Sequence, residues 1–251
     1  MDQQIELSGT LNFRDVGGMP VNGDRQVAYG RLFRSDTLQF LTATDVELLT
    51  DVVGLSSDID LRLDFELEVE GRGLITDTQV AFHLLPFQVE GGTTRDSATP
   101  ILQQDDPVVN HYVGYLKHSP NSVAGVIKLL AESGNLPAIV HCAAGKDRTG
   151  VAIAMVLAAL GCTPEAIAAE YAAGSHLVTD VMNRLRNMQS YGETINSLPP
   201  EASLTPPEYI ERFFQIINQT YGSAIDYLKV HGVTDQMLED LFTNLTEPRA
   251  S

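Results

Sequence analysis

The residues best suited to chemistry form one continuous segment, His141-Cys142-Ala143-Ala144-Gly145-Lys146-Asp147-Arg148-Thr149-Gly150. An apolar stretch precedes the segment and another follows it, which predicts a buried strand, a loop and a helix. Small residues at 143–145 let the backbone close tightly, so that amide N–H groups can point at one centre, where the helix dipole is also directed. We therefore predict a phosphate-binding loop whose contacts come from Ala143, Ala144, Gly145, Lys146 and Thr149.

Cys142 and Arg148 supply the reactive groups of this predicted loop. The guanidinium of Arg148 can hold two phosphate oxygens and stabilise charge that develops in the transition state. A free thiol has a pKa of about 8.5, and a helix N-terminus with a nearby arginine lowers such values to roughly 3.5–7.5. Cys142 is therefore the predicted nucleophile. Thr149 is expected to donate its hydroxyl to the Cys142 sulfur, and His141 to fix the loop through its ring or to act on the thiol pKa directly.

The oxygen that leaves phosphorus needs a proton, and Asp147 is the nearest acid. A bound phosphate dianion and a thiolate would both raise the pKa of Asp147 and keep it protonated, as a general acid must be. The alternative is that Asp147 only shapes the loop. The other carboxyl groups considered for this role are Asp60, which is best placed at the end of a strand, Asp64, Asp96 and Asp105.

Net charge and composition restrict the kinds of molecule that the protein is expected to bind. The 251 residues include 33 Asp and Glu against 16 Lys and Arg, a net charge of −17, which argues against nucleic acid because such binding depends on phosphate neutralisation. Lys146 could still form a local basic pocket, and contact with a substrate phosphate is a better prediction than a solvated side chain. It would favour substrates with more than one phosphate, such as phosphoinositide headgroups.

Membrane insertion and a disulfide framework are not expected. The longest apolar stretch, 151–160, is too short to span a bilayer. With two cysteines, Cys142 and Cys162, and no visible signal peptide, a reducing cytoplasmic location is the default. Secretion without a recognisable signal stays open as an alternative. No His, Cys and carboxylate cluster has metal-ligand spacing, so neither metal nor cofactor is expected. The sequence carries no signal for an oligomeric state.

Periodicity places strands and helices around the loop. Strands are predicted at 57–63, 80–85 and 136–141, helices at 107–116, 122–131, 151–160 and 165–188, and a polar loop at 88–106. Thr42, with Asp45 three residues later, predicts a helix start. The whole chain, 1–251, is expected to form one α/β domain in which a central mixed β-sheet is flanked by helices.

Several segments resemble one family. The ten residues 141–150 are similar to the motif of cysteine-dependent phosphatases, and the form Gly-Lys-Asp-Arg-Thr-Gly resembles that of the bacterial protein-tyrosine/serine phosphatases. The stretches 12–18, 31–35 and 221–241 are also similar to this family. Asp60-Leu61-Arg62 followed by Glu66 resembles another family block, although Leu63 stands where the family usually has Ser. The resemblance covers nearly the whole chain.

The resemblance implies a tyrosine-phosphatase-like fold and hydrolysis of phosphotyrosine, often also of phosphoserine, phosphothreonine and phosphoinositides. It implies Cys142 as nucleophile, Arg148 as phosphate clamp and Asp147 as acid, and a helical lid for which 176–205 is the candidate. An ordinary packed helical hairpin is the alternative for that segment. Because Trp is absent, the Trp-Pro-Asp loop of many tyrosine phosphatases is excluded.

The roles of several charged residues remain open in the sequence. Arg14 and Arg34 are expected either to reach the pocket or to pair with Asp15 and Asp36. Arg62, like Asp60 and His141, is a candidate for supporting the loop from behind.

Two other functions are compatible with a reactive cysteine or a phosphate-binding loop. A sulfur-transfer or redox protein would be supported by a Cys142–Cys162 disulfide. A helix of about ten residues separates these cysteines by about 15 Å or more, whereas bridged Cα atoms lie within about 7 Å, so this function is disfavoured. An inactive phosphate-binding module is the other alternative, although every residue that the chemistry needs is present.

Overall fold

The computed structural model describes residues 5–89, 107–197 and 204–249. Most of the predicted polar loop 88–106, including Asp96 and Asp105, lies outside the described residues, as do 198–203 of the candidate lid. The described strands form two sheets. The larger sheet has the order β1 Arg14–Asp15, β4 Leu32–Ser35, β7 Ala138–His141, β5 Ser57–Asp60 and β6 Ala81–Leu84. The smaller sheet has the order β2 Pro20–Val21, β3 Arg25–Val27 and β8 Thr246–Pro248.

Helices make up most of the rest of the described chain. The α-helices are α1 Ala43–Glu47, α2 Asp64–Glu70, α4 Pro107–His118, α5 Pro120–Ala131, α6 Asp147–Leu160, α7 Pro164–Ala172, α8 Val178–Arg186, α9 Gly192–Ser197, α10 Glu208–Tyr221, α11 Ala224–Val230 and α12 Asp235–Leu245. Short 3-10 or π-helical turns lie at Leu48–Val52, Gly73–Asp77, Ser133–Asn135 and Ser175–Leu177. None of the helices in the described ranges is both long and apolar enough to cross a membrane.

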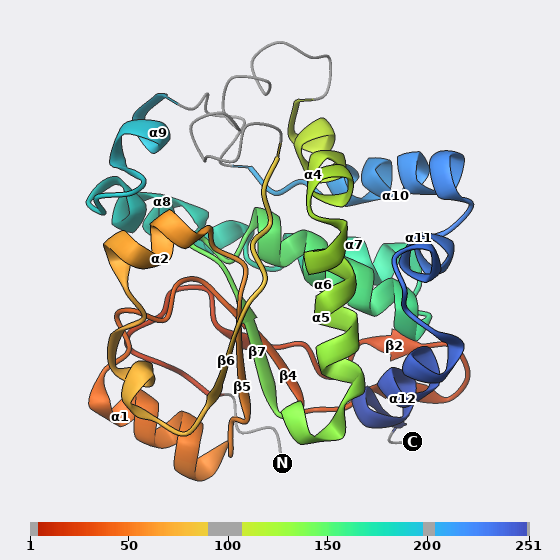
Figure 1. Ribbon diagram of the computed structural model, residues 1–251, viewed down its shortest axis with the longest axis horizontal. Coiled ribbons are helices and arrows are strands. Elements are labelled where there is room, and N and C mark those ends of the chain that lie inside the picture. The colour runs from red at the N-terminus through yellow and green to blue at the C-terminus, as the bar shows by residue number, and fades with distance from the viewer. Residues whose placement is uncertain (1–4, 90–106, 198–203, 250–251) are drawn as a thin grey trace.

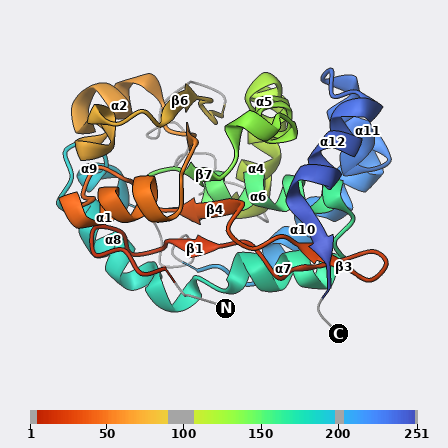
Figure 2. The ribbon, with the colours of Figure 1, turned by 90° about the horizontal axis from the view of Figure 1, so that it is seen from below.

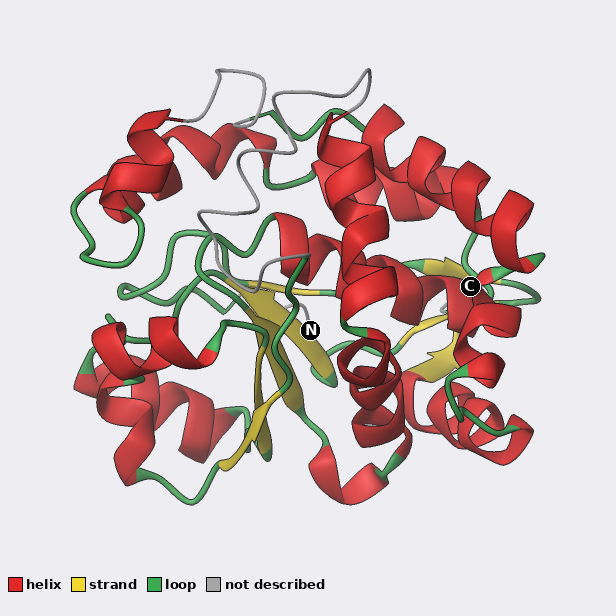
Figure 3. Cartoon of the chain, turned by 45° about the horizontal axis from the view of Figure 1, so that its top comes forward, coloured by secondary structure: helices red, strands yellow, loops and turns green. Residues whose placement is uncertain are grey.

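The central sheet is mixed, as predicted. β1 runs antiparallel to β4, whereas β4, β7, β5 and β6 are mutually parallel neighbours. Figure 1 shows α1 and α2 on one side of these strands and α4, α5 and α6 on the other. Helices also stand on both sides of the strands in the rotated view of Figure 3. The arrangement buries both faces of the sheet, as parallel strands require.

β7 lies between β4 and β5 and leads directly to the chemically interesting loop. Its residues alternate between two cores, since Ala138 and Val140 pack with the α5 and α6 side and Ile139 packs with the α1 side. All four residues of β7 are buried. Packing on both faces fixes the direction in which β7 ends, and this determines the position of Cys142, the next residue.

β5 differs from the sequence-based prediction in length and surroundings. The strand ends at Asp60 rather than at residue 63, and all four residues are buried, including Asp58 and Asp60. Alternation of apolar and polar residues usually indicates one solvated face. Here the carboxylates are buried because they meet cations, Arg72 for Asp58 and Arg62 for Asp60.

α6 is the central helix, and nearly all of its residues are buried. It ends at Gly161, whose φ of 83° is the left-handed conformation that favours glycine. Fourteen residues correspond to about 21 Å of helix. Cys142 precedes α6 and Cys162 follows it, and both are free thiols.

The N-terminal segment is attached to α1 through one carboxylate. Thr42 caps α1, and the predicted capping box with Asp45 is formed. The Asp45 carboxylate also accepts the N–H groups of Ser8 and Gly9, at 2.8 and 2.9 Å. Burial alone would raise the pKa of Asp45, but these backbone donors and those of Thr42 lower it. The ionised carboxylate is therefore the form that stabilises the fold.

We expect Asp45→Ala to lower the free energy of unfolding by about 2–4 kcal/mol, because one buried and two partly buried N–H groups lose a charged acceptor. A carboxyl with a lowered pKa stabilises the fold above its unfolded pKa of about 3.9 and ceases to do so as pH falls. The deficit measured by urea unfolding should thus be constant at neutral pH and shrink as pH falls below about 4. Asp51→Ala, at an exposed carboxylate on the next turn, is the control and should change stability little.

Candidate active site

The loop 142–146 connects β7 to α6 and is closed by a glycine. Gly145 has a φ of 64°, and a Cβ at this position would lie 2.5 Å from the carbonyl oxygen of Ser35. Any other residue would therefore be strained and would also push the loop away from the end of β4. The close approach explains why the sequence carries glycine at this position.

The carbonyl oxygens of residues 143–145 are all bound from outside the loop. The N–H of Thr37 donates to the first at 3.1 Å. Asn12 Nδ2 donates to the second and third at 3.1 Å each, and Arg34 Nη2 donates to the third at 2.6 Å. In a trans peptide the N–H points opposite to the preceding carbonyl. Outward carbonyls at 143–145 therefore direct the N–H groups of 144–146 into the loop, where they can bind an anion.

Two arginines and one glutamate form a cluster that supports the loop 142–146 from outside. Glu170 accepts from Arg14 Nε at 3.0 Å and from Arg34 Nη1 at 2.6 Å. Arg14 and Arg34 therefore neither bind Asp15 and Asp36, as one alternative proposed, nor extend into the loop. The reason is that both aspartates accept backbone N–H groups, and Glu170 is the carboxylate that faces both guanidiniums.

Burial and neighbouring charges shift the pKa values of Arg14 and Glu170. Burial and the neighbouring Arg34 lower the pKa of Arg14 to about 10, although Glu170 opposes the shift. Burial would raise the pKa of Glu170, but the two guanidiniums lower it. Glu170 is therefore ionised at neutral pH and holds both arginines in place.

Arg148 lies at the first turn of α6 and is held by Glu66. Its Nη1 and Nη2 donate to the two carboxylate oxygens of Glu66 at 2.5 and 2.8 Å. The N–H of Leu63 donates to the same carboxylate at 2.6 Å. Burial would raise the pKa of Glu66, but Arg148 and these hydrogen bonds lower it. A two-point contact with a buried anion fixes the plane of the guanidinium.

Asp147 occupies the first position of α6 and is bound by two donors. Tyr112 Oη donates to its Oδ1 at 2.6 Å, and Lys146 Nζ donates to the same oxygen at 2.8 Å. Burial would raise the pKa of Asp147, but Lys146 and then Tyr112 lower it. The side chain is 33% exposed, so solvent can reach the carboxyl group. Lys146 is neither solvated nor peripheral, since its side chain is only 4% exposed.

His141 supports the loop from the sheet. Its Nε2 lies 2.9 Å from Asp58 Oδ1, and its Nδ1 lies 3.3 Å from the carbonyl oxygen of Cys142. Burial would lower the pKa of His141, but Asp60 and Asp58 raise it. The ring-mediated support that the sequence predicted is therefore present, with the imidazole attached to β5.

Asp60 does not have the geometry of a general acid. The residue is fully buried, and its carboxylate binds Arg62 through Nε and Nη2 at 3.0 and 2.7 Å. Burial would raise its pKa, but His141 and Arg62 lower it. Arg62 is equally buried in this pair, so the two side chains hold each other at the end of β5. Asp64, at the start of α2, is exposed.

The predicted hydrogen bond from Thr149 to the Cys142 sulfur is not formed. The Thr149 hydroxyl is buried and has no hydrogen-bond partner among the described residues. It is therefore an unused donor in the first turn of α6. Cys142 itself is only 2% exposed.

α8 covers one side of the loop. Its apolar residues, Val178, Val181, Met182 and Leu185, belong to the same cluster as Ala143. Arg184 attaches the helix to the N-terminal segment by donating to the Gly9 carbonyl at 2.8 Å and to Asp36 Oδ2 at 3.1 Å. Figure 2 shows α7 and α8 one after the other along the same edge of the molecule.

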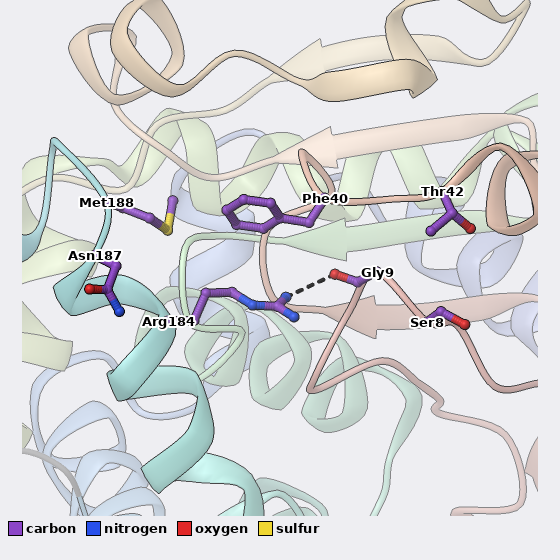
Figure 4. Close-up of a pocket in the computed structure, with 7 residues that line it drawn as sticks. All are labelled: Ser8, Gly9, Phe40, Thr42, Arg184, Asn187 and Met188. Atoms are coloured by element: carbon purple, nitrogen blue, oxygen red, sulfur yellow. Dashed lines mark hydrogen bonds between the residues drawn. The ribbon is translucent and has the colours of Figure 1, made fainter.

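A hollow lies where α8 and the residues after it meet residues 8–9 and 40–42. It has a volume of about 390 Å³, and Figure 4 shows Arg184 reaching across it to Gly9. Its lining is Ser8, Gly9, Phe40, Thr42, Arg184, Asn187 and Met188. None of these residues belongs to 141–150. Among the described residues, no group of three or more His, Cys, Asp or Glu side chains is arranged to hold a metal.

Several residues of the site were not predicted from the sequence. Asn12 and Glu66 lie inside segments noted for their family resemblance, and that was the available signal. Glu170 and Tyr112 lie within helices, where their spacing is that of ordinary packing positions. Nothing local distinguished these two residues.

Comparison with known proteins identifies the class. The sequence is 28% identical to the triple specificity protein phosphatase PtpB of Mycobacterium tuberculosis, over 91% of this chain and 94% of that protein. It is 29% identical to a putative tyrosine-protein phosphatase of Cupriavidus necator, over 87% of this chain and 80% of that protein. The catalytic core of the PP-IP phosphatase SIW14 from S. cerevisiae aligns with a TM-score of 0.34 and 14% identity, covering 75% of this chain and 89% of that one.

These relatives place the chain among the phosphatases, a class of hydrolases. The model of the tyrosine phosphatase family matches residues 5–247. The chain therefore belongs to the tyrosine phosphatase family.

We expect Glu66→Gln to lower kcat/KM by about 10- to 100-fold, because Arg148 would lose the anion that fixes its plane. Steady-state hydrolysis of para-nitrophenyl phosphate measures the effect. Glu68→Gln, on the same helix and exposed, is the matched control. Equal activity of the Glu66 and Glu68 variants would show that Arg148 does not need its partner.

Proposed function

We propose that this phosphatase hydrolyses phosphate monoesters, phosphotyrosine foremost, through a phosphocysteine intermediate on Cys142. The main support is the loop whose carbonyl groups at 143–145 are bound from outside. That arrangement directs successive N–H groups towards one centre, between the cysteine and the start of α6. Arg148, held in its plane by Glu66, supplies the positive charge for phosphate oxygens.

The reaction proceeds in two displacements. The Cys142 thiolate attacks phosphorus and forms an S–P bond while the P–O bond to the leaving group breaks. Asp147 gives its proton to the departing oxygen. Water then attacks phosphorus, Asp147 takes up a proton from that water, and the S–P bond breaks to return the electron pair to sulfur. Inorganic phosphate is released, and the Thr149 hydroxyl, which has no hydrogen-bond partner among the described residues, is an available donor in the first turn of α6.

Asp147 must be protonated to act as the acid, whereas Lys146 and Tyr112 favour its ionised form. A phosphate dianion beside it acts in the opposite direction, because a second negative charge raises the pKa of a carboxyl group. The dianion also competes with Asp147 for the Lys146 ammonium. Substrate binding therefore favours the protonated form of Asp147, which is the form that can act as the acid.

Lys146 also bears on substrate choice. It provides a buried cation next to the loop, which suits substrates that carry a second phosphate. PtpB is named a triple specificity phosphatase, and we extend to this chain an activity on phosphoserine, phosphothreonine and phosphoinositides beside phosphotyrosine. Phosphoinositide hydrolysis as the main activity is the alternative within the same mechanism.

The segment 176–205 is proposed as a lid. α8 packs its apolar side on the loop residue Ala143, so this helix controls access from that direction. The reaction needs no metal or cofactor, because the charge is supplied by Arg148 and backbone N–H groups. A nucleophilic thiol must stay reduced, which fits a reducing compartment such as the cytoplasm.

We expect Cys142→Ser to abolish release of inorganic phosphate, since the serine hydroxyl is a far weaker nucleophile in this site. Cys162→Ser is the matched control and should retain activity, because burial raises the pKa of Cys162 to about 12 and it lies beyond the other end of α6. Phosphotyrosine peptide, phosphoserine peptide and inositol phosphate headgroups are compared as substrates. Activity that persists in Cys142→Ser would remove the mechanism.

Asp147→Asn should lower kcat by about 100-fold on phenyl phosphate and far less on para-nitrophenyl phosphate, whose leaving group departs without a proton. Asp64→Asn tests the exposed alternative and should show no such dependence on the leaving group. Equal losses on both substrates in Asp147→Asn would contradict its role as the acid.

A further inference from the structure

The two carboxylate oxygens of Asp147 have different surroundings. Tyr112 Oη and Lys146 Nζ both donate to Oδ1, at 2.6 and 2.8 Å. Oδ2 accepts no hydrogen bond from the described residues. A proton on Oδ1 would have to displace one of two donors, whereas a proton on Oδ2 displaces none. The acid therefore carries its proton on Oδ2.

Tyr112 is itself held by a second phenol. Its hydroxyl lies 2.6 Å from that of Tyr171, and both rings are almost fully buried. A phenol has one proton, so Tyr112 can donate to Asp147 only if Tyr171 donates to Tyr112. The Tyr171 ring is in turn fixed against Gly150, where an added Cβ would lie 3.0 Å from the ring. The hydrogen bonds thus run in one direction, from α7 through α4 to α6.

We propose that Tyr112, supported by Tyr171, is a positioning residue that holds Asp147 Oδ1 so that Oδ2 delivers the proton to the leaving oxygen. The inference rests on the proposed role of Asp147. In the first displacement the O–H bond at Oδ2 breaks as the P–O bond breaks. In the second, Oδ2 takes the proton of the attacking water while the S–P electron pair returns to sulfur. Tyr112 keeps its own proton throughout.

The surroundings of Tyr112 and Asp147 agree with this assignment. Burial and the charge of Asp147 raise the pKa of Tyr112 well above its usual range, so its phenol remains a donor. Burial lowers the pKa of His111, one residue earlier on α4, to about 4. His111 is therefore neutral at the pH of the reaction. The charged and titratable groups that face Asp147 are Lys146 and Arg148 beside it, His111, Tyr112 and Tyr115 from α4, and Tyr171 from α7.

The pH dependence of kcat separates positioning from mere packing. Tyr112 donates to the carboxylate and so favours its ionised form, which means that its removal raises the pKa of Asp147. In Tyr112→Phe the basic limb of the kcat profile, where the acid loses its proton, should move up by about one pH unit. The plateau of kcat with phenyl phosphate should fall by about tenfold, because Asp147 Oδ2 is no longer held in position to protonate the leaving oxygen. The fall with para-nitrophenyl phosphate should be smaller.

Tyr227→Phe is the matched control. Tyr227, on α11, is fully buried, and its hydroxyl donates to the carbonyl of Leu116 on α4 at 2.8 Å rather than to Asp147. It should lose stability to a similar degree and leave the basic limb in place. Tyr171→Phe, which removes only the donor to Tyr112, should move the limb in the same direction by a smaller amount. This variant decides the question if Tyr112→Phe does not fold.

The outcomes distinguish the inference from the proposed function. If Asp147→Asn shows the expected dependence on the leaving group but the limb of Tyr112→Phe matches that of Tyr227→Phe, the positioning role is overturned and the general acid stands. A downward shift of the limb also overturns it. If Asp147→Asn shows no dependence on the leaving group, the acid assignment fails and the role of Tyr112 fails with it.

Discussion

Peptide orientation within residues 143–145 is the constraint on which the site depends. A loop of small residues gains little from side-chain packing, so its peptide planes would be free to rotate if their carbonyl oxygens were unbound. Asn12, Thr37 and Arg34 hold those oxygens outside the loop. Each donor comes from the segment between residue 12 and residue 37, and β4 places that segment beside β7. The geometry for binding an anion is thus imposed by a neighbouring strand and its flanking loops.

The surrounding charges are buried in pairs, and this has an energetic cost that packing must offset. Arg148 with Glu66, Arg62 with Asp60, and Arg34 with Glu170 are all nearly inaccessible to water. Buried ion pairs contribute little net stability compared with apolar residues of similar size. They fix orientation, because moving one partner would leave the other charge unpaired. The site therefore gains rigidity where the fold gains little stability.

The sequence was sufficient to predict the mixed sheet and the loop between β7 and α6, because these depend on local patterns. Gly145, an apolar strand before the loop and an apolar helix after it lie within one continuous stretch. The hydrogen-bonded support of the loop was not predictable in the same way. Glu170 meets Arg34 across 136 residues, and Tyr112 meets Asp147 across 35. The surroundings of Asp60 were not predictable for a related reason, since alternation does not show whether a polar side chain faces water or a buried cation.

The placement of the two thiols at opposite ends of α6 has a practical consequence. Cys162 is buried, and its proton is retained far into the alkaline range. Electrophilic labels react with the thiolate form of cysteine, so reaction at Cys162 should be slow at neutral pH. Burial at the far end of α6 thus works against labelling of Cys162 by covalent probes aimed at the loop.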